Sequence, residues 1–136
     1  MAKLLVVDDD ESTREILTAL FESGGHEVRA AVDGQGALAM LDAEPGIELV
    51  LSDVHMVGMD GLTLLESIRE RHPATPVVLM SAYASVDTAI AAIKAGAHDF
   101  LTKPLCLEDL RRVMDRALGP LGPRAAGRER GTRSMR

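Results

Sequence analysis

The sequence predicts an α/β domain in which a five-stranded parallel sheet is covered by five helices, in a doubly wound arrangement. Two observations support this fold class. Five strand-like segments alternate with five helix-like segments, and the strand-like segments include apolar runs with no polar alternation. Strands that are apolar on both sides belong in parallel sheets with both faces covered. A chain of 136 residues can bury a core of this kind as one domain.

Each expected element rests on its apolar pattern and on its end signals. Short apolar runs predict strands, whereas apolar residues spaced three and four apart predict helices. Ser12 and Glu15 form the pattern of a capping box at the start of the first helix, and Asp33 is interpreted as the cap of the second. In chain order we expect a strand over 3–7, a helix over 12–25 with Ile16, Leu17, Leu20 and Phe21 on its inward face, a strand over 26–31, a helix over 34–46, a strand over 48–52, a helix over 61–73 with Leu62, Leu65 and Ile68 inward, a strand over 76–81, a helix over 85–97, a strand over 99–104 and a helix over 107–118.

Composition excludes several classes of protein. Hydrophobic residues make up 46% of the chain, which argues against intrinsic disorder. No apolar run approaches the roughly 18 residues that a membrane span needs, and no signal-peptide pattern is present. Cys106 is the single cysteine, so neither an internal disulfide nor a zinc site of paired thiols is available. We therefore expect a cytoplasmic protein without a membrane partner.

Residues 119–136 differ from the rest of the chain in composition and charge. They contain five arginines and one acidic residue, which gives +4 in a chain of net charge −6 and leaves −10 on residues 1–118. The segment is rich in Gly, Pro and Arg and has no apolar periodicity, so we expect a disordered tail or linker after a domain over 1–118. The acidic domain itself is not expected to bind nucleic acid directly.

Charged and polar side chains follow four of the five expected strands. The carboxyl ends of parallel strands meet at one edge of the sheet, where open α/β sheets bind ligands. Two carboxylates about 4 Å apart repel by roughly 4 kcal/mol at an effective dielectric near 20, and Mg²⁺ removes this cost. A lysine and a hydroxyl nearby suit a phosphoryl group, so the pattern indicates phosphoryl transfer with an aspartate as a possible acceptor. The residues concerned are Asp8, Asp9 and Asp10 after the first strand, Asp53 after the third, Ser81 after the fourth and Lys103 after the fifth.

Four motifs at these strand ends resemble the receiver domain of two-component response regulators. They are VVDDD, LSDVHMVGMDG, MSA and DFLTKP, which occur in this order, and the resemblance covers about residues 3–118. The resemblance implies a flavodoxin-like strand order of 2-1-3-4-5. It also implies that Asp53 accepts a phosphoryl group from the phosphohistidine of a sensor histidine kinase or a phosphotransfer protein.

The resemblance further implies a role for each residue at the strand ends. Lys103 would pair with the phosphoryl group, and its peptide bond to Pro104 would be cis. Asp10 is expected to stabilise the positive N-terminal end of the first helix instead of binding metal. The implied Mg²⁺ ligands are Asp9, Asp53 and the main-chain oxygen of His55, with Asp8 bound through water.

Signalling would follow from Ser81 and Phe100, as the resemblance implies. Ser81 would bond the phosphoryl group, and Phe100 would turn inward as a rotamer switch. The face made by the fourth helix, fifth strand and fifth helix would then control an effector or output domain, or pair two copies of the chain. Lys94, Asp99 and Arg111 are the charged residues expected to contribute to such contacts.

Two other functions stay open. An aspartyl-phosphate phosphohydrolase would need a second acid two residues after its nucleophile, where this chain has His55. A receiver-like interaction module that is not phosphorylated would usually have lost Lys103 or one of the acids, and none is lost. A receiver catalyses only its own phosphorylation and dephosphorylation, so we expect no enzyme that acts on a separate substrate.

The chain departs from many receivers at Met56-Val57, where they have Met-Pro. Without the proline, we expect a more mobile loop and no loss of chemistry. His55 and Tyr83 lie two residues beyond the acceptor and the serine, where they flank the approach of water to an acyl phosphate. Both side chains are bulky, so we expect that phosphate to be comparatively long-lived.

Overall fold

The computed structural model describes residues 2–118, and its five strands form a single parallel sheet in the order β2-β1-β3-β4-β5. This order confirms the predicted fold class. The strands are β1 (Lys3–Val7), β2 (Glu27–Ala31), β3 (Leu49–Asp53), β4 (Val77–Ser81) and β5 (Asp99–Thr102), and the helices are α1 (Glu11–Ser23), α2 (Gly34–Ala43), α3 (Gly61–Arg71), α4 (Val86–Lys94) and α5 (Leu107–Leu118).

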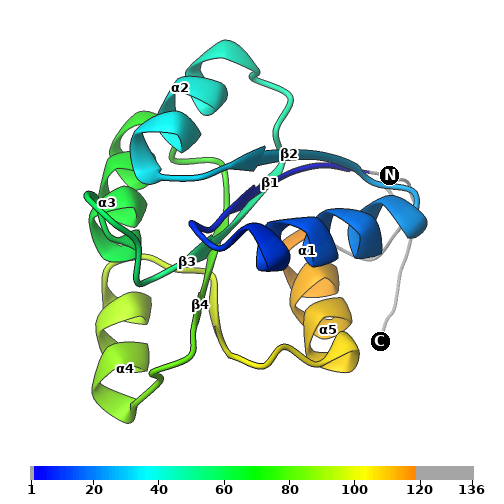
Figure 1. Ribbon diagram of the computed structural model, residues 1–136. Helices are drawn as coiled ribbons and strands as arrows, with labels where there is room; N and C mark the ends of the chain where they lie inside the picture. The colour runs from blue at the N-terminus through cyan, green and yellow to red at the C-terminus, as the bar shows by residue number, and fades with distance from the viewer. Residues whose placement is uncertain (1, 119–136) are drawn as a thin grey trace.

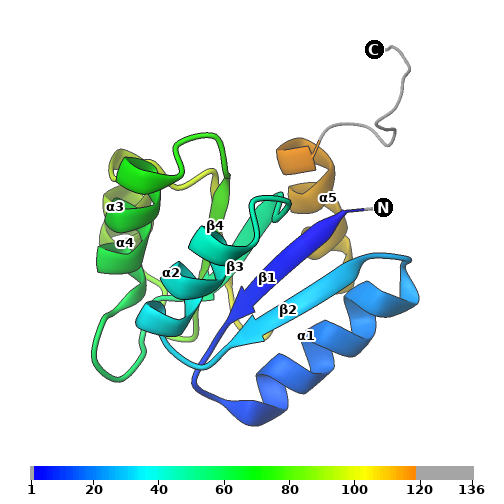
Figure 2. The same cartoon turned by 90° about the horizontal axis from the view of Figure 1, so that it is seen from above.

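Helices cover both faces of the sheet (Figures 1 and 2). Leu17 and Phe21 of α1 and Leu110 of α5 pack in one core with side chains from one face of the strands. Helices α2, α3 and α4 pack on the other face, in a second core. Each fully buried aliphatic side chain of these cores contributes about 1.5–3 kcal/mol to folding, so the two layers fix the sheet rigidly between them.

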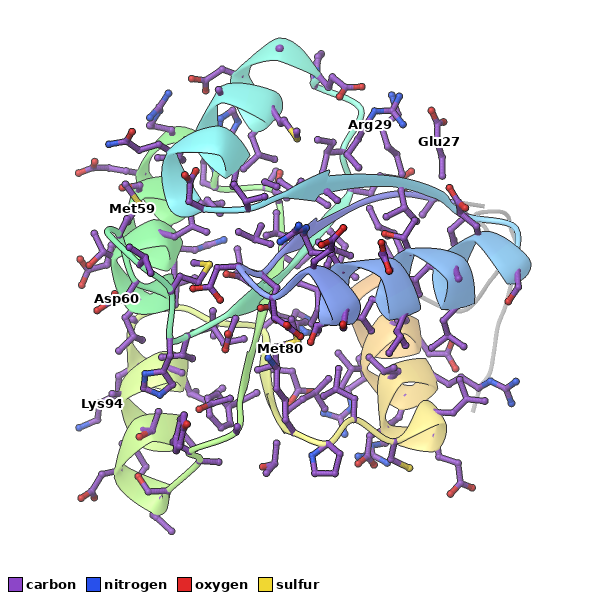
Figure 3. All side chains as sticks on the ribbon, viewed as in Figure 1. Glu27, Arg29, Met59, Asp60, Met80 and Lys94 are labelled. Carbon is purple, nitrogen blue, oxygen red and sulfur yellow. The ribbon has the colours of Figure 1, made fainter. Side chains whose placement is uncertain are left out.

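The register of the central strands brings their carboxyl ends to the same level. Val7 of β1 pairs with Ser52 of β3, so the residues that follow, Asp8 and Asp53, lie side by side. Asp53 in turn pairs with Met80 of β4, which is labelled in Figure 3. Strands β3 and β4 are buried along their whole length, because helices cover both faces. The sheet therefore presents its polar strand ends at one edge.

Two details of the first helix differ from the prediction. Its N-cap is Asp10, whose side chain accepts a hydrogen bond from the main-chain N–H of Thr13, so the predicted capping box of Ser12 and Glu15 is wrong. Asp10 comes earlier in the chain and caps equally well, and the helix begins one residue before the proposed box. Ile16 is 66% exposed, so its predicted inward position is also wrong.

The next three helices also start at an acid or hydroxyl cap. Asp33 caps α2 as predicted, Asp60 caps α3, and Ser85 caps α4. Within residues 2–118, no helix has the length and apolar character needed to cross a bilayer. The tail predicted over 119–136 lies outside the described residues.

Candidate functional site

Three carboxylates gather at the carboxyl end of the sheet. Asp8 and Asp9 follow β1, Asp53 ends β3, and one oxygen from each lies within 4.8 Å of the others. Asp8 is fully buried and Asp53 is buried, whereas Asp9 is exposed. Three carboxylate oxygens at this spacing, open to solvent on one side, are a ligand set that a hard cation such as Mg²⁺ prefers.

Asp8 is tied to the protein through both of its oxygens. Its Oδ1 accepts a hydrogen bond from the main-chain N–H of Asp10 at 2.9 Å, and its Oδ2 accepts one from Nζ of Lys103, also at 2.9 Å. The same Lys103 Nζ lies 3.5 Å from Oδ2 of Asp53. These contacts fit a carboxylate that holds the lysine in place and reaches a metal through water.

The electrostatics of the cluster disfavour the charge on Asp53. Burial, together with the negative charge of Asp8, raises the pKa of Asp53 above its usual value, and the nearby Lys103 only partly offsets this. Burial by itself would lower the pKa of Lys103, but its hydrogen bond and charge interaction with Asp8, and those with Asp53, raise it. Lys103 therefore stays positively charged, and a further positive charge near Asp53 would stabilise the ionised carboxylate.

The loop after β3 contacts the carboxylates through its main chain. The N–H of Val57 donates to Oδ2 of Asp9 at 3.3 Å, and the N–H of His55 lies 3.4 Å from Oδ1 of Asp53. Gly58 follows with a φ of +83°, in the left-handed region that favours glycine. Val57 thus holds an acidic side chain through its main chain, a contact that the sequence does not indicate.

The loop ends at Gly61, which approaches the acceptor strand closely. A Cβ atom at Gly61 would lie 2.4 Å from the main-chain oxygen of Asp53, so only glycine fits. The N–H of Gly61 donates to the main-chain oxygen of Val54 at 2.8 Å. Asp60-Gly61 is typical of a turn and a helix start, but nothing in the sequence indicates that this glycine lies against the main chain of β3.

Ser81 lies at the end of β4 with no exposed surface. Its Oγ accepts a hydrogen bond from the main-chain N–H of Tyr83 at 2.9 Å, which leaves the hydroxyl proton free to be donated. The Tyr83 ring meets the His55 ring edge-on, with centroids 5.2 Å apart, and Tyr83 is 75% exposed. The two residues predicted to flank the acceptor do therefore contact each other.

The other residues expected to carry a signal lie on β5, α4 and α5. Phe100 is partly buried and packs against the core beneath α2, α3 and α4. Lys94, labelled in Figure 3, and Arg111 are exposed on α4 and α5. Asp99 is already paired with Arg116 at 2.8 Å, so within the described chain it is less available for a partner than the sequence suggested.

The structure brings the predicted site residues together at one edge of the sheet. Asp8, Asp9, Asp53 and Lys103 form one cluster, and the peptide bond between Lys103 and Pro104 is cis, as predicted. The Asp8–Lys103 ion pair was not predicted, because the residues are 95 positions apart and both had been given other partners.

Comparison with known proteins identifies the family. The family model of the response regulator receiver domain matches residues 4–115. The chain belongs to this family. The transcriptional regulatory protein ZraR of Salmonella typhimurium is 45% identical over 115 residues, which are 85% of this chain and 26% of that protein. The receiver domain described here thus spans about a quarter of the length of the curated relatives that it matches.

Solved structures agree with this assignment. A response regulator receiver domain protein from Clostridium thermocellum has a TM-score of 0.82 and 30% identity, over 86% of this chain and 94% of that one. A response regulator protein from Burkholderia pseudomallei, solved with a phosphorylated aspartic acid, a calcium ion and citrate, has a TM-score of 0.78 and 30% identity, over 85% of this chain and 69% of that one. As a receiver domain, the chain is a component of phosphorylation-dependent two-component signalling.

Proposed function

We propose that this receiver domain accepts a phosphoryl group on Asp53 from the phosphohistidine of a sensor histidine kinase or phosphotransfer protein. The observation that carries the proposal is the position of Asp53. Its buried carboxylate ends β3 beside two further aspartates, and Nζ of Lys103 lies 3.5 Å from its Oδ2. A carboxylate oxygen would form a bond to phosphorus while the bond from phosphorus to the imidazole nitrogen breaks, and the donor histidine leaves with the electron pair of that bond.

The residues around the acceptor fit the binding of Mg²⁺. Asp9, Asp53 and the main-chain oxygen of His55 would hold the ion, and Asp8 would contact it through water. The raised pKa of Asp53 supports this assignment, since an acidic cluster with one lysine is under-neutralised. When bound, the ion would offset the charge of the transferred phosphoryl oxygens.

The chain's own side chains would position the phosphoryl group. Lys103 lies close enough to both Asp8 and Asp53 to turn from one to a phosphoryl oxygen on the other with a small movement. Ser81 would donate its remaining hydroxyl proton to a second phosphoryl oxygen. These contacts combine charge with orientation, which together supply most of the catalysis in phosphoryl transfer.

The output would be read from the face made by α4, β5 and α5. Movement of Ser81 toward the phosphoryl group would free space that Phe100 could fill, and this would alter a face that exposes Val86 and Ile90. The matched relatives are longer proteins, which supports an effector or output domain as the partner, with pairing of two copies as a further route. We place the protein in the cytoplasm, with a receiver domain over 1–118 and a linker over 119–136.

Intact-mass measurement tests the proposed acceptor. Incubation with acetyl phosphate or a phosphorylated kinase, in the presence of Mg²⁺, should add one phosphoryl group to the parent and none to Asp53→Asn. Asp87→Asn, on exposed α4, serves as a matched control and should be phosphorylated like the parent. An unchanged mass increment in Asp53→Asn would place the acceptor elsewhere. No increment in the parent would favour an interaction module that is not phosphorylated.

A further inference from the structure

Met59 occupies a space that exists because residue 34 is glycine. A Cβ atom on Gly34 would lie 2.7 Å from Sδ of Met59 and 3.1 Å from its Cβ and Cγ. Gly34 is buried at the first position of α2, and the partly buried Met59 packs against the core beneath that helix. The side chain of Met59 therefore connects the β3–α3 loop, on which Figure 3 labels it, to the start of α2.

Met59 is one of two partly buried side chains of the loop that pack against this core, the other being Met56. Val57 is 81% exposed, and Gly58 meets no atom within 4 Å of its Cβ position, so neither fixes the loop by packing. Yet the main-chain N–H of Val57 is placed 3.3 Å from Oδ2 of Asp9. A loop without a proline at position 57 needs other restraints to hold that geometry, and the packed side chains of Met56 and Met59 lie on either side of Val57. Of these two, Met59 is the one that lies against Gly34 at the start of α2.

We propose that Met59 is a positioning residue for the acceptor loop. By filling the space at Gly34, it restrains the main chain of residues 55–57 over Asp9, so that α2 supports the metal-binding edge. The inference rests on the proposed binding of Mg²⁺ at that edge. According to this proposal, the affinity for Mg²⁺ depends on the absence of a side chain at residue 34, although α2 contributes no ligand to the ion.

Gly34→Ala tests this proposal because it should favour the helix locally and yet weaken the binding of Mg²⁺. Gly34 has no left-handed φ, and alanine is the better helix former, so local propensity favours the variant. The added methyl group should nevertheless displace Met59. We expect faster hydrogen exchange at the N–H of Val57 without metal, and a Mg²⁺ dissociation constant raised about threefold or more. Gly36→Ala, in the same helix but facing Asp33 and Ala31, is the matched control and should change neither quantity.

The variants at position 59 separate positioning from general damage. Met59→Ala should weaken Mg²⁺ binding as Gly34→Ala does, and Met59→Leu, which keeps most of the volume, should restore it. In the Met59→Ala background, Gly34→Ala should have little further effect, because its steric partner is gone. The unfolding of each variant is measured separately, so that a loss of stability is not mistaken for a loss of Mg²⁺ affinity.

Each outcome bears on one proposal or the other. If the parent does not bind Mg²⁺, the proposed function fails, whereas hydrogen exchange at Val57 still tests the loop contact. If the parent binds Mg²⁺ and Gly34→Ala matches it within twofold, with unchanged exchange at Val57, the positioning role of Met59 is overturned. Equal effects of Gly34→Ala with and without Met59 would overturn it as well.

Discussion

Lys103 lies closer to Asp8, to which its Nζ donates a hydrogen bond at 2.9 Å, than to the proposed acceptor Asp53, from which its Nζ lies 3.5 Å. The ion pair connects β1 to the segment after β5, across the middle of the sheet. Since Asp8 has no exposed surface, its charge depends on this lysine for compensation. The residue proposed to bind the phosphoryl group therefore has a structural partner before any phosphoryl group arrives.

Lys103→Met should destabilise the protein because it leaves Asp8 buried without its cation. We expect a loss of about 2 kcal/mol in the free energy of unfolding, measured by urea denaturation without metal. Added Mg²⁺ should recover part of the loss. Lys94→Met, which removes an exposed lysine from α4, should change the free energy by less than about 0.5 kcal/mol. Equal losses in the two variants would show that the Asp8 pair contributes nothing specific.

Asp53→Asn should stabilise the metal-free protein at neutral pH. Burial and the charge of Asp8 raise the pKa of Asp53, so the stability of its protonated form is fully present below the ordinary value of 3.8 and is lost as pH rises through the raised value. We expect the variant to exceed the parent by on the order of 1 kcal/mol at pH 7, given the repulsion between close carboxylates.

The pH dependence of this difference is its control. The excess stability of Asp53→Asn should shrink as pH falls through the raised pKa of Asp53 and should be gone below the ordinary value of 3.8, where the parent's carboxyl group is protonated in both the folded and the unfolded state. It should also shrink when Mg²⁺ is added to the parent. Thermal denaturation across pH 3–8 measures both effects, and a difference that grows toward low pH would contradict the raised pKa of Asp53.

Asp9→Ala and Asp10→Ala should separate metal binding from helix capping. Asp9→Ala should reduce Mg²⁺ affinity at least tenfold, about 1.4 kcal/mol, because it removes a proposed ligand. Asp10→Ala should affect affinity far less, but it removes the cap whose Oδ2 accepts hydrogen bonds from Thr13, so the protein should become less stable. Calorimetric titration and denaturation of both variants measure the two effects, and a reversed order of affinities would refute the assignment.

Tyr83→Ala should speed loss of the phosphoryl group. Tyr83 meets His55 edge-on, with ring centroids 5.2 Å apart, and we expect the pair to limit the approach of water to a phosphoryl group on Asp53. We expect dephosphorylation about threefold faster, equivalent to ~0.7 kcal/mol of activation free energy. Val86→Ala, equally exposed at the start of α4, is the control in a phosphate-release assay. Equal or slower decay in Tyr83→Ala would show that the ring does not shield the phosphoryl group.

Ser81→Ala should uncouple phosphorylation from the signal. The variant should still accept a phosphoryl group at Asp53, because the acceptor and Lys103 are intact, but it should lose most of the response at Phe100. A phosphoryl group shifts an equilibrium between two conformations only if it interacts more favourably with one of them. Ser81 is proposed to make the interaction that favours one conformation. Main-chain NMR shifts of residues 82–100, with and without beryllofluoride as a phosphoryl mimic, measure the response. Shifts as large as those of the parent would remove Ser81 from the pathway.

The strands, and the edge of the sheet where the site lies, could be predicted from the sequence because parallel strands that are buried on both faces consist of consecutive apolar residues. LLVV and VVLM are such runs, and the residue after each run must lie at the same edge. The buried face of the first helix was harder to predict. The spacing of apolar residues indicates that a helix has a buried face, but it does not show which of these residues lie at the middle of that face. Leu17 and Phe21 are buried while Ile16 is not.

Contacts between distant segments were not predictable in the same way. The Asp8–Lys103 pair and the bond from Val57 to Asp9 depend on side-chain and loop positions that only the packed structure fixes. The glycines show the same limit. Asp60-Gly61 marks a helix start in the sequence, but nothing there indicates that the glycine lies against the carbonyl oxygen of Asp53.

The close approach of Gly61 to the main chain of Asp53 restricts movement of the acceptor on the side of α3. The main chain at Val54 bonds to Gly61 on one side, at 2.8 Å, and to Met80 of β4 on the other, at 2.9 Å, so the end of β3 cannot shift toward α3. We therefore expect a group added to Asp53 to be accommodated on the side of β4, at Ser81, which is held by hydrogen bonds from the main-chain N–H groups of Tyr83 and Lys103, both at 2.9 Å, and not by a close approach like that of Gly61. Phosphorylation of Asp53 would in this way displace the chain on the β4 side of the acceptor more than on the side of α3, where Gly61 packs against β3.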